Sequence, residues 1–266
     1  MPAGSSIHRI VSNQMSASID SQQTGRVTVL RMAHGKANAI DLELLVALSQ
    51  HLHRLREAPA VVLTGTGTIF SAGVDLFRVV DGGRAYLDRF LPVLRKTFNE
   101  LMAFPRPLVA AVNGHAIAGG CILVETADHR VMTSGTGRIG LTELLVGVPF
   151  PVDAIEIVRL ATGGGSLSRI VNLAETVPAE RAIELGLIDE PAEPDVVLAR
   201  AVEVATAMAA VPARSFELVK RELRAPFWDA LESRSGHFDG EVDEAWKSDA
   251  ALRSIAAYVE TLRARR

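Results

Sequence analysis

Leu108-Val-Ala-Ala-Val-Asn-Gly-His-Ala-Ile-Ala-Gly-Gly-Cys-Ile-Leu-Val-Glu-Thr-Ala-Asp128 is the stretch of sequence that decides the fold. Its first part, Leu108 to Val112, is a short apolar run typical of a fully buried strand. Asn113-Gly114 breaks that run, and Ala118-Gly119-Gly120 opens an apolar segment long enough to form a buried helix. The stretch therefore predicts a strand, a turn and a helix in direct succession.

The glycine pair Gly119-Gly120 stands where this helix is predicted to begin. The first turn of a helix leaves backbone N–H groups without partners, and glycines let a ligand approach those groups closely. The same groups lie at the positive end of the helix dipole. The segment therefore predicts a site for an anion or an oxyanion.

Length and composition restrict the class of protein. A chain of 266 residues can form one large domain or two small ones with a substantial core. A formal net charge of -3 gives no basic surface for nucleic acid, and the absence of a long apolar run predicts no membrane span. The polar first 20 residues lack the apolar core of a signal peptide. Cys121 is the single cysteine, which excludes an intramolecular disulfide and fits a cytoplasmic location.

Strand-like and helical patterns alternate on both sides of the central stretch. Two runs, Met15 to Asp20 and Arg26 to Met32, predict a hairpin around Gln23-Thr24-Gly25. Further predicted elements are a helix over 41–57 with Asp41 as N-cap, a strand over 60–64, a variable segment containing Asp81-Gly82-Gly83, a helix over 85–103, a strand over 129–133 and a helix over 152–161. This alternation predicts an α/β fold with parallel strands joined by crossovers.

The last third of the chain is almost entirely helical in pattern. Helices are expected over 179–185, ended by Gly186, and over 194–211, 213–223 and 243–263. We therefore expect residues 1–200 to form the α/β core and residues 201–266 to form a separate helical module.

Three features point to the same chemistry. Ala72-Gly73 follows a strand and a turn, so it is a second place, besides Gly119-Gly120, where backbone N–H groups are predicted to be free. Two such donors directed at one oxygen make an oxyanion hole, which holds the enolate formed when a proton leaves the carbon beside a thioester carbonyl. The third feature is Glu143, an acid in an otherwise apolar stretch. A partly desolvated glutamate has a raised proton affinity and suits proton transfer.

The sequence resembles the crotonase (enoyl-CoA hydratase/isomerase) superfamily over nearly its whole length. Four segments carry the resemblance, in the family's order and spacing: Lys36-Ala37-Asn38-Ala39, Phe70 to Leu76, Val112 to Cys121 and Ala182 to Asp189. It implies a crotonase fold of repeated ββα units, with a C-terminal module that forms trimers or dimers of trimers. It also implies an acyl-CoA substrate, whose coenzyme A is part of the substrate, with no separate cofactor and no metal.

The resemblance also assigns roles to residues of this chain. It implies that the N–H groups of Ala72 and Gly119 hold the thioester oxygen and that Glu143 is the catalytic base. The residues implied to lie along the CoA moiety are Lys36, Ala37, Ala72, Gly73, Val74 and Asp75. Tyr258 matches an aromatic position that, in relatives, approaches the CoA adenine of a neighbouring subunit.

Two departures from the family pattern favour one reaction over another. Hydratases of the family carry a second glutamate directly after Gly-Cys, but here that position is Ile122. Adding water needs one group to activate water and another to protonate carbon, whereas one carboxylate suffices to move a proton between two carbons. Val148-Pro149-Phe150-Pro151 also resembles the mitochondrial-type delta-3, delta-2-enoyl-CoA isomerases. The pattern favours an isomerase; a hydratase with an atypical second acid and a catalytically silent CoA-thioester-binding protein stay as alternatives.

Three other residues are candidates for a second acid or base. Glu125 follows Ile122 by one helical turn, Asp153 stands near the apolar segment of Glu143, and His115 follows Asn113-Gly114. Structural roles are favoured for all three: an ion pair for Glu125, an N-cap for Asp153 and a satisfied hydrogen bond for His115. Cys121 is expected to be packed and inert. The sequence predicts no acyl chain length.

Overall fold

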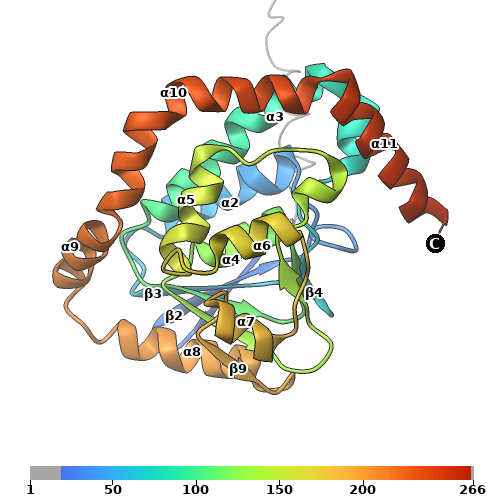
Figure 1. The fold of residues 1–266 in the computed structure, drawn as a ribbon. Helices are drawn as coiled ribbons and strands as arrows, with labels where there is room; N and C mark the ends of the chain where they lie inside the picture. The colour runs from blue at the N-terminus through green and yellow to red at the C-terminus, as the bar shows by residue number, and fades with distance from the viewer. Residues whose placement is uncertain (1–18, 265–266) are drawn as a thin grey trace, which may run out of the picture.

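The computed structural model describes residues 19–264, and its centre is a six-stranded sheet (Figure 1). The strands, in spatial order, are β1 (Ile19–Thr24), β2 (Val27–Met32), β3 (Ala60–Thr64), β5 (Leu108–Val112), β7 (His129–Thr133) and β9 (Glu190–Ala192). β1 and β2 form an antiparallel hairpin, and every later pairing is parallel. The predicted α/β class is confirmed. The hairpin is also confirmed, although β1 begins at Ile19, and residues 15–18 of the predicted strand lie outside the described residues.

The two faces of this sheet bury different helices, because successive side chains of a strand point to opposite faces. On one face, small side chains such as Val62 and Ala111 pack against α8 (Val197–Met208). On the other face, Leu63, Ala110 and Val112 pack in the larger core with α2 (Leu42–Arg54), α3 (Leu76–Met102), α4 (Gly119–Glu125) and α5 (Val152–Ala161). Figure 1 shows α8 below the sheet and the other helices above it. α8 runs through the position between residues 200 and 201 where we expected the core to end.

A second, small sheet was not predicted. It consists of β4 (Ile69–Ser71), β6 (His115–Ile117) and β8 (Ile139–Gly140), which pair in parallel in that order. Because parallel strands end at the same edge, the residues that follow β4, β6 and β8 are brought together. Those residues are Ala72-Gly73, Ala118-Gly119 and the segment that carries Glu143.

One helix prediction was incomplete and one was wrong. The variable segment with Asp81-Gly82-Gly83 is itself part of α3, which begins at Leu76 after the N-cap Asp75, and the helix predicted over 85–103 is the part of α3 that follows Gly83. Gly83 interrupts that helix with φ 54° and ψ −145°, a conformation open to glycine, so the chain kinks and continues. The single helix predicted over 243–263 is two helices, α10 (Ala225–Lys247) and α11 (Asp249–Ala264), separated at Ser248.

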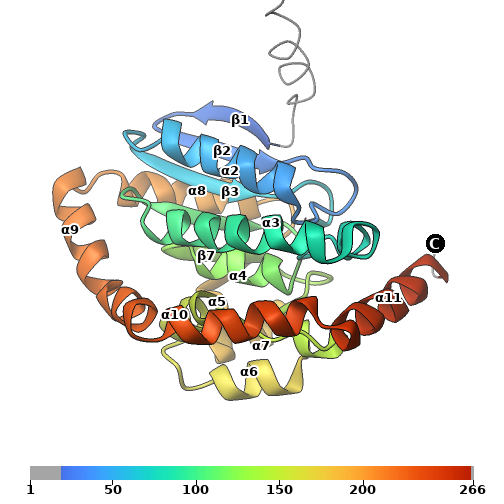
Figure 2. The ribbon, with the colours of Figure 1, turned by 90° about the horizontal axis from the view of Figure 1, so that it is seen from above.

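The remaining elements connect the core to the C-terminal end. They are the 3-10 helix η1 (Glu143–Val146), α6 (Leu167–Leu173), α7 (Ala179–Leu185) and α9 (Ala213–Leu223). α7 ends at Gly186 with φ 77°, as predicted. Figure 2 shows α9, α10 and α11 as an arm around the core, with α10 alongside α3 and α5. None of the helices in residues 19–264 is long and apolar enough to cross a membrane.

Candidate active site

The small sheet places two backbone loops side by side at the mouth of a pocket. The loop after β4 contains Gly73, and the loop after β6 contains Gly119. A Cβ on Gly73 would lie 2.7 Å from the carbonyl oxygen of Ile117 and 3.2 Å from the amide nitrogen of Gly119, so only glycine permits this approach. Between β6 and α4, Ala118 has φ 54°, a strained conformation for a residue with a side chain. At this residue the chain turns sharply from strand β6 into helix α4.

Two backbone N–H groups at this junction, those of Gly119 and Val74, have no acceptor among the described residues. Gly119 is the first residue of α4, and its N–H has no acceptor within residues 19–264. The N–H of Ala72, predicted to be the second donor, instead donates to the carbonyl of Ala37 at 3.0 Å. The prediction for Ala72 as an oxyanion donor is therefore corrected, because a donor already bonded within the protein is not available to a ligand.

The N–H of Val74 is unbonded because of the way its segment pairs with Ile40. Its neighbours are bonded to Ile40: the Ile40 N–H donates to Gly73 O at 2.8 Å, and the Asp75 N–H donates to Ile40 O at 2.9 Å. In this parallel bridge the Val74 N–H takes no part, and it meets no acceptor among the described residues. Val74 and Gly119 both line the pocket, and both N–H groups are without an acceptor among the described residues, which makes them the candidate donors for a ligand there.

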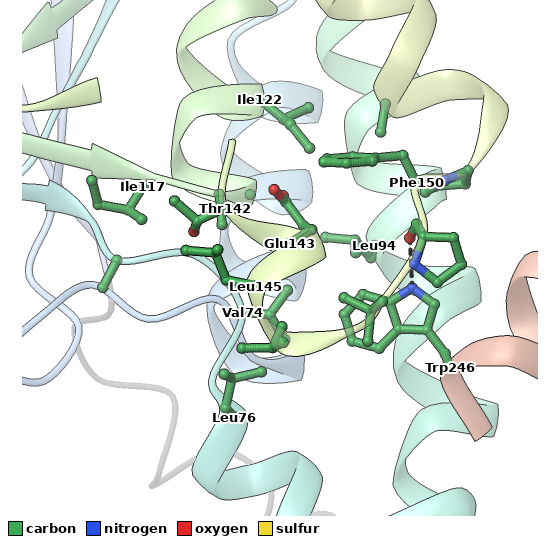
Figure 3. Close-up of a pocket in the computed structure, with 18 of the residues that line it drawn as sticks. Val74, Leu76, Leu94, Ile117, Ile122, Thr142, Glu143, Leu145, Phe150 and Trp246 are labelled. Atoms are coloured by element: carbon green, nitrogen blue, oxygen red, sulfur yellow. Dashed lines mark hydrogen bonds between the residues drawn. The ribbon is translucent and has the colours of Figure 1, made fainter. Parts of the chain in front are cut away.

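Glu143 begins η1 and lies inside the pocket, where Figure 3 shows it between Thr142 and Leu94. Its side chain is buried, and Oε2 has no hydrogen-bond partner among the described residues. Burial raises the pKa of Glu143 to about 8, while hydrogen bonds from its own backbone and that of Thr142 oppose the rise. A carboxyl group with this pKa is suited to take up and return a proton near neutral pH.

The pocket has an empty volume of about 750 Å³, its open mouth included. Apart from Glu143, the side chains around it are mostly apolar: Val74, Leu76, Leu94, Phe98, Ile117, Ile122, Leu145, Val146, Val148, Phe150 and Trp246 are among them. The C-terminal arm supplies Trp246 from α10 and Tyr258 from α11. The arm thus completes the pocket of its own chain.

The comparisons with known proteins agree with this arrangement. The family model for enoyl-CoA hydratase/isomerase matches residues 22–265. The chain belongs to this family. The predicted family and the crotonase fold are therefore confirmed, and the protein is a crotonase-type enzyme of a family that processes acyl-CoA thioesters.

Relatives of this chain include proteins named as enoyl-CoA isomerases and proteins named as enoyl-CoA hydratases. Enoyl-CoA delta isomerase 1 of Rattus norvegicus, a mitochondrial protein, is 25% identical over 250 residues, which cover 92% of this chain and 86% of the relative. A putative enoyl-CoA hydratase of Thermus thermophilus is 35% identical over 196 residues, 71% of this chain and 77% of the relative. The crystal structure of human mitochondrial delta3-delta2-enoyl-CoA isomerase has a TM-score of 0.88 at 24% identity, with 94% and 100% of the two chains covered. That structure is similar in fold, and the family includes both isomerases and hydratases.

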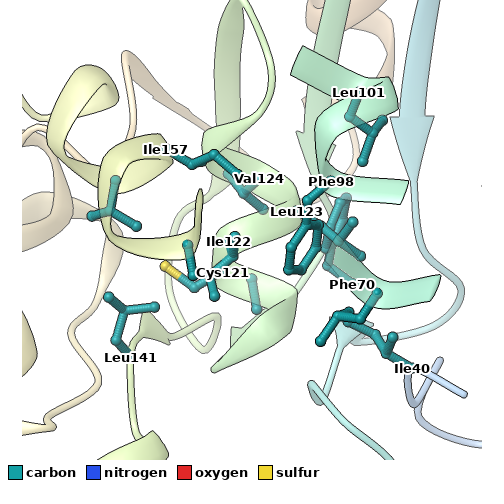
Figure 4. Packing of buried hydrophobic residues seen from close by; sticks show 14 of the residues in the cluster. Ile40, Phe70, Phe98, Leu101, Cys121, Ile122, Leu123, Val124, Leu141 and Ile157 are labelled. Atoms are coloured by element: carbon teal, nitrogen blue, oxygen red, sulfur yellow. The ribbon is translucent and has the colours of Figure 1, made fainter. Parts of the chain in front are cut away.

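Ile122 distinguishes this family member from one with two acids in its pocket. It lies on α4, one turn from Gly119, with its side chain 4% exposed. Figure 3 shows it beside Glu143, and among the described residues that line the pocket Glu143 is the only acid. In Figure 4 Ile122 also packs with the core residues around Cys121. Cys121 is fully buried, so the expectation of a packed cysteine is confirmed.

The other candidate acids and bases lie outside the pocket lining. Glu125 is paired with Arg130 in the core, which confirms the predicted structural ion pair. His115, on β6, does not line the pocket. Asp153 is not the N-cap of α5: it lies in the first turn, where its Oδ1 accepts the Ala154 N–H, and the Val152 N–H is bonded by Asp239 of α10.

The residues predicted on the CoA moiety divide into two groups. Ala72, Val74 and Tyr258 line the pocket. Outside the lining are Ala37, Gly73, Asp75 and the exposed Lys36. Tyr258 lines the pocket of its own chain and is 39% exposed, and its approach to the CoA adenine of a neighbouring subunit stays a prediction. Sequence reasoning missed Trp246 entirely, because a lone tryptophan in a helical pattern gives no signal that separates a pocket from the core.

Proposed function

We propose that this protein is an enoyl-CoA isomerase that converts 3-enoyl-CoA into 2-enoyl-CoA. The observation that carries the proposal is a single carboxyl group, Glu143, in a pocket where Ile122 occupies the position of a hydratase's second acid. Moving a double bond needs one group that removes a proton and returns it nearby. Hydration needs a second polar group to hold and activate water, and Ile122 offers none.

The mechanism follows from the arrangement of Glu143, Val74 and Gly119. The thioester oxygen accepts hydrogen bonds from the N–H groups of Val74 and Gly119. The Glu143 carboxylate removes a proton from C2, and the electron pair moves onto the thioester oxygen to give a dienolate. The protonated Glu143 then returns the proton at C4, and the double bond forms between C2 and C3. One proton leaves and one returns, so the step balances without a metal or a redox cofactor.

Contacts to the CoA moiety are part of this proposal. Ala72 and Val74 line the pocket, which supports the placement of the run from Ala72 to Asp75 along the pantetheine arm. Lys36 and Ala37 precede the buried Asn38, whose carbonyl accepts a hydrogen bond from Ser71 Oγ at 2.8 Å. This bond ties the Lys36 loop to the Ala72 loop, and the exposed Lys36 ammonium is available there for a CoA phosphate.

The decisive experiment offers the protein 3-enoyl-CoA and 2-enoyl-CoA in separate assays. Formation of the conjugated thioester from 3-enoyl-CoA is followed by its ultraviolet absorbance, and products are identified by chromatography. Isomerisation that Glu143→Gln abolishes is the expected result. Conversion of 2-enoyl-CoA into 3-hydroxyacyl-CoA by the parent at a comparable rate would make it a hydratase, and tight binding without turnover would make it a silent CoA-thioester-binding protein.

We also propose a trimer or a dimer of trimers, built through the helical module of residues 201–266, in the cytoplasm. Leu218, Val219 and Leu223 support a docking role for α9, because these side chains are exposed by 38%, 59% and 67%. Sedimentation equilibrium on the purified chain tests the assembly, and a monomer would contradict it. Fractionation of the producing cells tests the location.

A further inference from the structure

The pocket is lined by apolar side chains on the side of Glu143 that is away from Ile117. Figure 3 shows Leu94, Phe150 and Trp246 on this side, and we call these three residues the end wall. Their one polar side-chain atom, Trp246 Nε1, already donates to the carbonyl of Pro149 at 3.0 Å. A hydroxyl or charged group placed against the end wall would lose its hydrogen bonds to water without finding new ones.

The end wall is firmly held. Trp246 is 5% exposed and stands near the end of α10. Ion pairs from the same turn of α10 to α3 lie on either side of it in the sequence: Asp243 with Arg95 and Lys247 with Asp88. The bond to Pro149 also fixes the segment that carries Phe150, so two parts of the wall hold each other in place.

We propose that Trp246 is a specificity-determining residue that sets how long an acyl chain the pocket accepts. The substrate class is then CoA thioesters of hydrocarbon chains without polar substituents and of limited length. This inference rests on the proposed function, because it assigns the pocket to an acyl-CoA. Each methylene buried in the pocket tightens binding about fourfold, until the chain end meets the indole of Trp246.

Binding of saturated acyl-CoA thioesters tests this without any need for turnover. Titration calorimetry on the full-length parent, with an even-numbered series from butanoyl-CoA to hexadecanoyl-CoA, is expected to show affinity rising with length and then levelling or falling. Trp246→Ala should move that limit to longer chains. Trp246→Phe, which keeps an aromatic ring in the wall, should move it less, and it carries the test if the alanine variant does not fold.

A matched control is available on the same helix. Trp228 is half-buried, packs edge-on against Phe227 and lies outside the pocket lining, so Trp228→Phe should leave the length limit of the parent unchanged. Adipoyl-CoA, whose far end is a carboxylate, should bind at least tenfold more weakly than hexanoyl-CoA.

Each contrary outcome has a separate meaning. An unchanged length limit in both Trp246 variants, or an equal shift in Trp228→Phe, would overturn the role of Trp246. Adipoyl-CoA binding as tightly as hexanoyl-CoA would overturn the apolar substrate class. Failure to bind any acyl-CoA would overturn this inference together with the proposed function. A length limit that depends on Trp246 in a protein that isomerises nothing would support this inference and contradict only the proposed reaction.

Discussion

The backbone N–H of Ala72 donates a hydrogen bond to the carbonyl oxygen of Ala37 at 3.0 Å. Together with the bond from Ser71 Oγ to Asn38 O, it fastens the loop before α2 to the loop after β4. The bond removes Ala72 from the list of free donors and leaves Val74, two residues further on, to face the pocket. This bond and the bridge between Ile40 and Val74 together leave the Val74 N–H, and not the Ala72 N–H, without an acceptor among the described residues.

The close contact between the loop after β4 and the loop after β6 predicts the effect of adding a methyl group at Gly73. Gly73→Ala would place Cβ 2.7 Å from Ile117 O at a residue with φ +81°, so the loops must separate and the Val74 and Gly119 donors must diverge. We expect kcat for isomerisation to fall about 100-fold, the loss typical of one missing oxyanion donor. Gly25→Ala is the control, because Gly25 also has positive φ, +58°, but has no atom within 4 Å of the added Cβ. Equal losses of kcat in the two variants would contradict this account of the hole.

Glu143→Gln tests the base itself. The amide has nearly the same shape as the carboxyl group but removes no proton, so kcat should fall by about 10²- to 10⁴-fold. Affinity for a saturated acyl-CoA should change little, since Glu143 Oε2 has no partner within the described residues to lose. Steady-state kinetics and calorimetry measure the two effects separately. A variant that keeps parental kcat would exclude Glu143 as the base.

The raised pKa of Glu143 predicts opposite trends of activity and stability with pH. The base must be ionised, so kcat/KM should rise with pH and level off above a pKa of about 8. Because burial disfavours the charged form, the folded protein holds this proton more tightly than the unfolded chain does. The contribution of protonated Glu143 to the free energy of unfolding is full below the unfolded pKa of 4.5. It is lost as pH rises through the folded pKa of about 8.

The Glu143→Gln side chain does not ionise, so comparing the unfolding of this variant with that of the parent measures how the Glu143 proton affects stability. Relative to the parent, the variant should gain free energy of unfolding between pH 5 and pH 9, on the order of 4 kcal/mol. Urea unfolding at several pH values checks it. A difference between variant and parent that stays constant over this range would mean that Glu143 titrates normally in the folded protein.

Sequence patterns predicted the elements whose signals are local. The strands Ala60–Thr64, Leu108–Val112 and His129–Thr133 have the predicted bounds, because each is a continuous run suited to a buried strand with polar or turn-forming residues at its ends. The small sheet of β4, β6 and β8 was missed, because its strands have two or three residues and depend on pairing between distant segments. Glu143 was found for a local reason as well, as a lone acid in an apolar run.

The N–H groups of Gly119 and Val74 show which part of the site local sequence patterns could predict and which part they could not. Gly119 was predicted from its own helix start, and its N–H has no acceptor among residues 19–264. Val74 could not be told from Ala72 by sequence, because the bridge to Ile40 and the bond to Ala37 decide which of the two N–H groups is free. Trp246 likewise joins the pocket through the packing of α10 on α3 and α5, a contact between segments far apart in the chain.

Ile122→Glu asks whether one missing carboxyl group is what separates this site from a hydratase. Ile122 lines the pocket beside Glu143, so a glutamate there would put two carboxyl groups around the same space, enough to hold and activate a water. We expect 3-hydroxyacyl-CoA to form from 2-enoyl-CoA at a rate at least tenfold above the parent, measured by chromatography. Since the new carboxyl is buried, with Ile122 only 4% exposed, the variant should also lose about 1–3 kcal/mol of stability.

Ile122→Gln is the control for that experiment, because it introduces a polar group of the same length without a carboxylate. If the glutamine variant hydrates as fast as the glutamate variant, the gain comes from space and polarity and not from acid–base chemistry. If neither hydrates while both still bind acyl-CoA, the geometry around Glu143 itself disfavours water, and Ile122 is a consequence of the isomerase function rather than its cause. Only hydration confined to Ile122→Glu supports the view that this side chain decides the reaction.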